Sequence, residues 1–240
     1  MEAKERIILA LDVDEPERAL DLARQLSPYV GAFKIGMQLF NSAGPQIVRD
    51  IQARGGEVFV DLKFHDIPNT VGAASKVMTR LGAKMFNLHA AGGREMMKAA
   101  ADAAADEAAR LGLARPIVLA VTVLTSISQA QLEQEMMVTG HSVSELALRW
   151  AVMAKKSGLS GVVCSPHEAH HIKQHCGPDF LTVTPGIRPA WSAANDQKRI
   201  TPPAQAVRMG ADYMVIGRPI TAADDPVAAA ARIISELEAK

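Results

Sequence analysis

Eight short apolar runs recur along the chain, separated by stretches with helical periodicity. Because the runs are almost continuously apolar, they predict parallel strands that helices cover, and not a half-exposed antiparallel sheet. Eight such alternations in 240 residues favour a closed (β/α)8 barrel, the TIM-barrel form of the α/β class, with an open doubly wound sheet as the alternative. The runs are Ile7–Val13, Ala32–Gly36, Glu57–Lys63, Met85–His89, Ile117–Leu124, Gly161–Cys164, Leu181–Thr184 and Tyr213–Ile216.

The segments between the runs fit a single domain over residues 1–240, since no linker or change of composition divides the chain. Pro16–Leu26 has an acidic start and Met96–Arg110 is rich in Ala, Glu and Lys, so both predict helices. Two connections are long, Thr125–Gly140 and Pro185–Pro203, and the second suits an ordered or closing loop. In a barrel both would lie on the face where active sites are built.

Charge and composition exclude several classes of partner. Lys plus Arg and Asp plus Glu each total 26, so no strong overall field favours nucleic acid or an anionic membrane. Residues 1–6 are charged and no run is long enough to cross a bilayer, so we expect neither a secretory signal nor a membrane span. Cys164 and Cys176 match neither a metal motif nor a disulfide framework, which predicts the reducing cytoplasm.

A charged group, Asp61-Leu62-Lys63-Phe64-His65-Asp66, ends the third run. Alternation along a strand sends Asp61 and Lys63 to the same side, so both face the barrel interior at its C-terminal mouth if Leu62 packs outward. Asp66 falls just beyond, in the loop. A surface ion pair is the alternative, but it fits poorly because the strand before these charges is apolar.

Polar residues at other strand ends converge on the same mouth. Asp12 follows the apolar part of the first run, although it also suits the cap of the next helix. Lys34 lies between Phe33 and Ile35, so its ammonium needs an anionic partner if it points inward. Thr125 and Ser126 follow the fifth run, whereas a lone histidine such as His89 is more often a core residue.

The eighth run is followed by Gly217 and Arg218, which suggest a phosphate site. A glycine there lets backbone N–H groups approach an anion, and an arginine can make bidentate contacts with phosphate oxygens. Barrels often hold a phosphate at this position. Alone the pair would be an ordinary turn, but Arg188 and Gln197 on the preceding long loop strengthen the prediction.

Six segments in order along nearly the whole chain resemble the signatures of orotidine 5′-phosphate decarboxylases of the bacterial type. The run from Asp61 to Thr70 is highly specific, whereas its Asp-x-Lys-x-x-Asp core also occurs in related barrel enzymes. The segments are Ala10-Leu11-Asp12, Phe33-Lys34-Ile35-Gly36, Asp-Leu-Lys-Phe-His-Asp-Ile-Pro-Asn-Thr at 61–70, Val123-Leu124-Thr125, Pro185-Gly186-Ile187-Arg188 and Ile216-Gly217-Arg218.

The resemblance implies conversion of orotidine 5′-monophosphate to uridine 5′-monophosphate in de novo pyrimidine biosynthesis, with no cofactor and no metal. Lys63 would be the proton donor to the ring carbon C6, within a charged array that Asp61, Lys34 and Asp66 complete. It also implies a homodimer in which Asp66 and Thr70 reach the partner's site. The remaining implied substrate contacts are Asp12 and Lys34 at the ribose, Thr125 near the base, and Arg188, Gln197, Gly217 and Arg218 at the phosphate.

Two other functions are weighed against this one. A magnesium-dependent decarboxylase or aldolase of the same barrel group would share Asp-x-Lys-x-x-Asp but would carry an acidic metal ligand where this chain has Lys34, and a cation there repels a metal ion. A noncatalytic phosphate-binding barrel would need the phosphate residues but not the internal charges of Asp61, Lys63 and Asp66.

Overall fold

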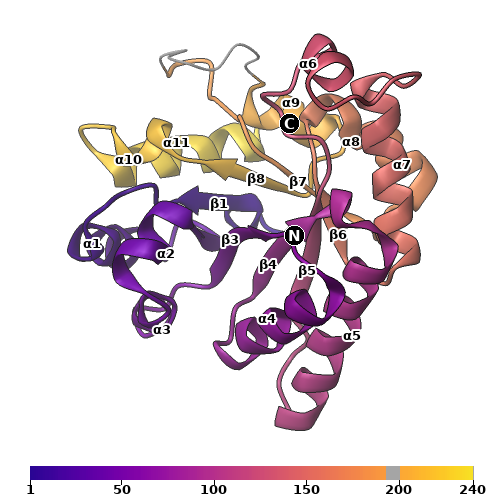
Figure 1. Cartoon of the computed structure of the whole chain (residues 1–240). Coiled ribbons are helices and arrows are strands. Elements are labelled where there is room, and N and C mark those ends of the chain that lie inside the picture. The colour runs from indigo at the N-terminus through magenta and orange to yellow at the C-terminus, as the bar shows by residue number, and fades with distance from the viewer. Residues whose placement is uncertain (193–200, 240) are drawn as a thin grey trace.

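The computed structural model describes residues 1–192 and 201–239 and forms a closed barrel of parallel strands surrounded by helices (Figure 1). The strands follow one another around the barrel in chain order, and β8 pairs with β1 to close it. At least one helix lies between each strand and the next. The (β/α)8 prediction is therefore confirmed, and the open-sheet alternative is wrong.

The elements have the following bounds. The strands are β1 Ile7–Ala10, β2 Ala32–Gly36, β3 Val58–Phe64, β4 Met85–His89, β5 Ile117–Val121, β6 Gly161–Val163, β7 Leu181–Thr184 and β8 Tyr213–Ile216. The helices are α1 Pro16–Leu26, α2 Met37–Ala43, α3 Gln46–Gln52, α4 Pro68–Arg80, α5 Gly93–Leu111, α6 Gln129–Gln134, α7 Val143–Lys156, α8 Pro166–Cys176, α9 Pro203–Arg208, α10 Arg218–Thr221 and α11 Pro226–Glu238, with short 3-10 helices at Lys4–Arg6 and Ala90–Gly92.

Four strands, β2, β4, β7 and β8, have the predicted bounds, and the others differ at their ends. The first strand ends at Ala10 and not at Val13, and the fifth ends at Val121 and not at Leu124. In both cases the neighbouring strand on one side stops early: β8 ends at Ile216, opposite Leu9, and the short β6 ends at Val163, opposite Val121. Ala10 pairs only with Lys34 of β2, and the last bonds run from the Leu11 N–H to Lys34 O and from the Thr122 N–H to Val163 O. The third strand is shifted by one residue, and the sixth is one residue shorter than predicted.

Helix ends follow local capping. The predicted helix at Pro16–Leu26 is confirmed, whereas α5 is longer than predicted and ends before Gly112, whose φ of 65° places it in the left-handed region. The connection Thr125–Gly140 is not a plain loop, because it contains α6. That helix starts at a capping box in which Ser128 and Gln131 satisfy each other's backbone N–H groups.

Apolar side chains form two layers, one inside the barrel and one between the barrel and the helices. The outer layer is the larger, and Leu62 packs against it. The inner layer is a small cluster that closes the barrel below its mouth, made of Ile8, Ala32, Phe59, Met85, Leu119 and Val183. Side chains therefore fill the barrel below its mouth, which leaves room for a ligand at the mouth. Within residues 1–192 and 201–239, no helix is long and apolar enough to cross a membrane.

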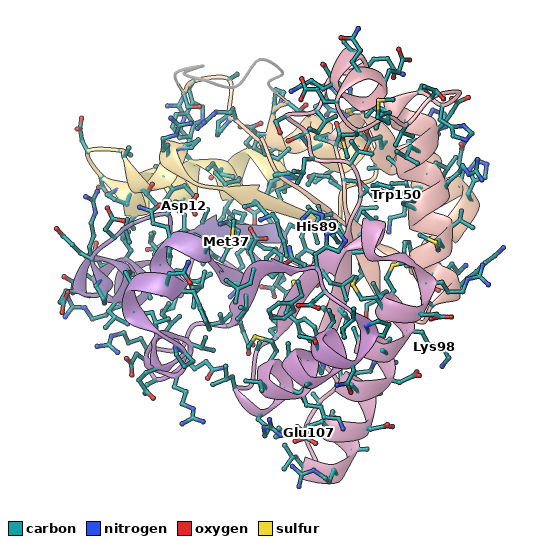
Figure 2. The ribbon with its side chains drawn as sticks, viewed as in Figure 1. Asp12, Met37, His89, Lys98, Glu107 and Trp150 are labelled. Atoms are coloured by element: carbon teal, nitrogen blue, oxygen red, sulfur yellow. The ribbon has the colours of Figure 1, made fainter. Side chains whose placement is uncertain are left out.

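One buried charge joins two outer helices far from the mouth. Glu107, near the lower end of α5 in Figure 2, is 5% exposed and contacts Arg110 at 2.7 Å and Arg80 of α4 at 3.1 Å. The hydrogen bonds from Arg110, reinforced by the charges of both arginines, outweigh burial and lower the pKa of Glu107 to about 2. This carboxylate is therefore ionised and stabilises the α4–α5 pair.

Candidate active site

The end of β3 departs from regular strand geometry where its charged residues begin. Pairing with β4 shifts between Val60 and Phe64, and Lys63 has a φ of 54°, in the left-handed region that side chains rarely adopt. Leu62 packs outward against the helices, as the argument from alternation required. The irregular backbone therefore lies at Lys63, the lysine expected from the sequence to be the proton donor.

Four charged side chains meet at the mouth: Lys34 on β2, Asp61 and Lys63 on β3, and Asp12 in the loop after β1. The Lys63 ammonium lies 2.7 Å from Asp61 Oδ1, and the Lys34 ammonium lies 3.5 Å from Asp61 Oδ2. Lys34 also donates to Asp12 Oδ1 at 2.9 Å. The charges alternate in sign along Asp12, Lys34, Asp61 and Lys63. Asp61 and Lys63 therefore share the inner side, and Lys34, which is 8% exposed, has the anionic partners that its burial requires.

The pKa of Asp61 is lowered below its ordinary value of 3.8. Burial of the carboxyl raises the pKa, but the charges of Lys34 and Lys63 and hydrogen bonds from Lys63 and Asn87 lower it by more. The carboxylate is therefore ionised at neutral pH. This fixed anion lies 2.7 Å from the Lys63 ammonium and holds it by a hydrogen bond.

Asn87 of β4 is a site residue that the sequence analysis missed. It is fully buried, its Oδ1 accepts a hydrogen bond from the Lys63 backbone N–H at 2.8 Å, and its Nδ2 donates to Asp61 Oδ1 at 2.7 Å. The available signal was an amide inside the apolar run Met-Phe-Asn-Leu, because a buried amide requires hydrogen-bond partners.

His89 ends β4 beside these charges, near the middle of the view in Figure 2. Its ring lies 5.5 Å from the ring of His65 between centroids. Burial, followed by the nearby His65 and Lys63, lowers the pKa of His89, and Asp61 opposes the shift only in part. The imidazole is therefore predominantly neutral at neutral pH and adds no lasting positive charge to the array.

A cavity of about 420 Å³ opens at the mouth and joins the predicted residues from different strands. Its floor is apolar, with Phe59, Val121 and Val163 among its lining residues. Thr125 and Ser126 line it after β5, as predicted. The other predicted residues that line it are Asp12, Lys34, Asp61, Lys63, Arg188, Gly217 and Arg218.

The wall formed by the connections after β7 and β8 carries two guanidinium groups, Arg188 and Arg218. Arg188 is 5% exposed, and its backbone N–H donates to Thr201 O at 3.1 Å, beside a parallel bridge between Ile187 and Thr201. Arg218 begins α10 directly after Gly217. This wall is suited to a phosphate-like anion, because guanidinium groups bind such oxygens in pairs.

Two predicted residues lie elsewhere, and a third falls outside the described residues. Asp66 and Thr70 are exposed and do not line the cavity of their own chain, and Asp66 Oδ1 accepts a hydrogen bond from the Ile67 backbone N–H at 2.6 Å. Gln197 lies outside the residues that the structure describes. In the described part of the chain, no group of three or more His, Cys, Asp or Glu residues could hold a metal ion.

Comparison with known proteins gives one consistent family. Residues 5–233 match the model of the orotidine 5′-phosphate decarboxylase / HUMPS family. The chain is 63% identical to orotidine 5′-phosphate decarboxylase from Syntrophomonas wolfei, covering 99% of this chain and 100% of that protein. It is 52% identical to the protein of that name from Moorella thermoacetica, covering 99% and 94%.

A solved structure agrees with the sequence comparisons. The crystal structure of orotidine 5′-phosphate decarboxylase from Lactobacillus acidophilus superposes with a TM-score of 0.86 at 40% identity. The match covers 97% of this chain and 99% of that one. The likeness therefore extends over the complete barrel and is not limited to the charged motif.

Proposed function

This chain belongs to the orotidine 5′-phosphate decarboxylase family and is a carboxy-lyase of pyrimidine biosynthesis, and we propose that it works without a cofactor, with Lys63 as the proton donor. The substrate is orotidine 5′-monophosphate and the products are uridine 5′-monophosphate and carbon dioxide. The observation that carries the proposal is the Lys63 ammonium, 2.7 Å from Asp61 on the wall of the cavity.

The chemical difficulty is the carbanion that forms when the bond from ring carbon C6 to the carboxylate breaks. The electron pair of that bond stays on C6, where no neighbouring carbonyl delocalises it well. An ammonium held beside C6 stabilises the developing charge and then transfers its proton there, so that carbon dioxide leaves and a C–H bond replaces the C–C bond. Lys63 supplies both effects, and solvent reprotonates its neutral amine afterwards.

Asp61 has a supporting role in this mechanism. Its carboxylate fixes the Lys63 ammonium and balances Lys34 on its other oxygen. An anion near the substrate carboxylate could also destabilise the bound substrate. We favour stabilisation of the transition state, because Lys63 and Lys34 offset the charge of Asp61.

Substrate binding is assigned to the remaining polar residues of the cavity. Arg188, Gly217 and Arg218 would bind the phosphate together with Gln197, and Asp12 and Lys34 would bind the ribose. Thr125 would lie near the base. Because the phosphate is remote from C6, its binding energy can position the ring and close the Pro185–Pro203 connection over it.

Turnover of orotidine 5′-monophosphate by the purified protein tests this proposal. Loss of the orotidine absorbance should be seen with and without a chelator, and Lys63→Ala should nearly abolish it while uridine 5′-monophosphate still binds. Restoration by magnesium of an activity lost on chelation would favour the metal-dependent alternative. Binding of the nucleotide without turnover would favour the noncatalytic one, and an active Lys63→Ala variant would exclude this lysine as the donor.

We propose in addition that the enzyme is a homodimer in which Asp66 and Thr70 complete the partner's site. Both residues are exposed on one chain and follow Lys63 closely in sequence, yet neither lines the cavity of its own chain. Large apolar side chains near the mouth are also exposed, with Ile67 at 65%, Met37 at 54% and Leu124 at 40%. Burial of these side chains by a second copy of the chain would favour such a dimer.

Mixing two inactive variants tests the shared site. Lys63→Ala and Asp66→Ala homodimers, unfolded together and refolded at equal concentration, should form mixed dimers in which one site has both groups. With random pairing and independent sites, roughly a quarter of the native activity should return. No recovery, with mixed dimers confirmed by mass spectrometry, would contradict the sharing of Asp66 without affecting the decarboxylase assignment.

A further inference from the structure

Asn87 is an uncharged, buried polar side chain that contacts the charged array. It is fully buried in β4, between Phe86 and Leu88, which are also fully buried. An amide in such a place destabilises the fold unless hydrogen bonds satisfy it. Both of its bonds go to β3, one to the backbone of Lys63 and one to the carboxylate of Asp61.

The backbone at Lys63 explains why a side chain is needed there. Pairing between β3 and β4 is interrupted between Val60 and Phe64, so the Lys63 N–H finds its acceptor in Asn87 Oδ1 and not in a backbone carbonyl. A left-handed φ at a lysine is energetically unfavourable and persists only when surrounding contacts hold it. The φ of 54° at Lys63 has such a contact in Asn87.

The second bond controls the orientation of Asp61. Asp61 Oδ1 accepts from both Lys63 Nζ and Asn87 Nδ2, each at 2.7 Å, while Oδ2 faces Lys34 at 3.5 Å. Asn87 Nδ2 lies on a different strand from both lysines and fixes the rotation of the carboxylate. The direction in which Asp61 holds the Lys63 ammonium therefore depends on β4.

We propose that Asn87 is a positioning residue for the decarboxylation, which holds the Lys63 backbone and the Asp61 carboxylate in the geometry that aims the ammonium at C6. The inference rests on the role proposed for Lys63. This role requires a hydrogen-bond acceptor for the Lys63 N–H and a donor to Asp61 on one short side chain. Leucine has a similar shape and offers neither, and aspartate offers only the acceptor when it is ionised.

Asn87→Leu is the main test, with Thr182→Val as its matched control. Thr182 is also a fully buried polar residue of a barrel strand, and its Oγ1 donates to Gly210 O at 2.6 Å, but it does not line the cavity. Both variants should have a lower melting temperature than the native protein. Asn87→Leu should in addition lower kcat by about 10²-fold, the usual effect of displacing a reacting group by about 1 Å. Its affinity for uridine 5′-monophosphate should stay near that of Thr182→Val.

Asn87→Asp separates the two hydrogen bonds and keeps the test informative if the leucine variant does not fold. It can still accept from the Lys63 N–H, but it faces Asp61 with a second carboxylate. The pKa of Asp61, which the Asn87 bond now helps to lower, should rise, and the acid limb of kcat/KM should move to higher pH. The other charged and titratable groups around Asp61 are Lys34, Lys63, His89, His65 and, through Lys34, Asp12.

The outcomes separate this inference from its premise. A kcat for Asn87→Leu equal to that of Thr182→Val, or a pH profile of Asn87→Asp that overlays the native one, would overturn the role of Asn87. Equal losses of kcat, nucleotide affinity and stability would do the same, since they would indicate a structural role only. Lys63→Ala measured in parallel tests the premise: if it is inactive while Asn87→Leu is fully active, only the inference about Asn87 fails.

Discussion

Replacing Lys34 with methionine tests how much the charged array contributes to stability as well as to catalysis. Methionine keeps an unbranched, flexible stem and removes the ammonium. That ammonium lies 2.9 Å from Asp12 Oδ1 and 3.5 Å from Asp61 Oδ2. The two partners differ in exposure, because the Asp12 side chain is 59% exposed and that of Asp61 is 13% exposed.

The magnitude follows from these distances and exposures. The pair with Asp12 contributes about 0.2–1 kcal/mol, as solvent-exposed pairs do. The attraction to Asp61 is about 5 kcal/mol at an effective dielectric constant of about 20. Methionine offsets part of this loss because it has no ammonium to desolvate, and Lys63 still pairs with Asp61. We expect a net loss of about 2–4 kcal/mol, which lowers the melting temperature of a chain this long by about 5–15 °C.

The loss should depend on pH in a defined direction. In the native protein the pKa of Asp61 is lowered, so its ionised form adds stability that is present above its ordinary value of 3.8 and disappears as pH falls through the lowered value. In Lys34→Met, burial remains and one cation is gone, so the pKa of Asp61 rises and the ionised form stabilises the fold less. The difference in melting temperature from the native protein should therefore be large at about pH 8 and smaller at about pH 4.

Thermal unfolding followed by circular dichroism at both pH values measures this difference. Lys84→Met is a suitable control, since Lys84 is not one of the residues that line the cavity. A Lys34→Met difference that is the same at both pH values would refute the coupling to Asp61. Its kcat/KM should also fall, because Lys34 is proposed to bind the ribose.

Four further predictions concern other parts of the molecule. Arg218→Ala should raise the dissociation constant of uridine 5′-monophosphate strongly, whereas Lys63→Ala should change it little, as isothermal calorimetry would show. Exhaustive dialysis against a chelator should leave turnover unchanged, and a loss that only magnesium reverses would contradict this. Glu107→Gln should lower the melting temperature at neutral pH, and the gap should close as pH falls from 4.5 towards the pKa of about 2, since protonation removes the native carboxylate. Burial raises the pKa of Cys164 and of Cys176, so a thiol reagent should modify neither until the protein is unfolded.

The part of the site that the sequence predicted consists of charges in apolar surroundings. Asp61 and Lys63 follow an apolar strand, and Lys34 lies inside one, so their burial and mutual pairing could be inferred from the high energy of an isolated buried charge. The barrel fixes the rest, since all parallel strand ends meet at one mouth. Their pairing and their position at the mouth were predicted correctly because local sequence and global topology point to the same place.

Asn87 and the backbone of Lys63 could not be predicted in the same way. The role of Asn87 depends on the shift in pairing between β3 and β4, which is a property of two strands together and not of either sequence. The early ends of β1 and β5 also involve a second strand, because β8 and β6 stop opposite Leu9 and Val121. The helix α6 is different, because its Ser128–Gln131 capping box is a local sequence pattern from which the start of a helix could have been predicted.

In the proposed mechanism the cavity separates the chemistry from the anchoring of the substrate. The charged array lies on β2, on β3 and in the loop after β1, and the two guanidinium groups lie on the connections after β7 and β8. A nucleotide whose phosphate contacts Arg188 and Arg218 must extend its ring across the apolar floor towards Lys63. The wall with Arg188 and Arg218 does not change charge during the reaction, so by itself it would bind substrate and transition state equally well. Its binding energy contributes to catalysis only if it is used to hold the ring against the charged array. A substrate without its phosphate should therefore lose kcat as well as affinity, and a loss confined to KM would mean that the two walls act independently.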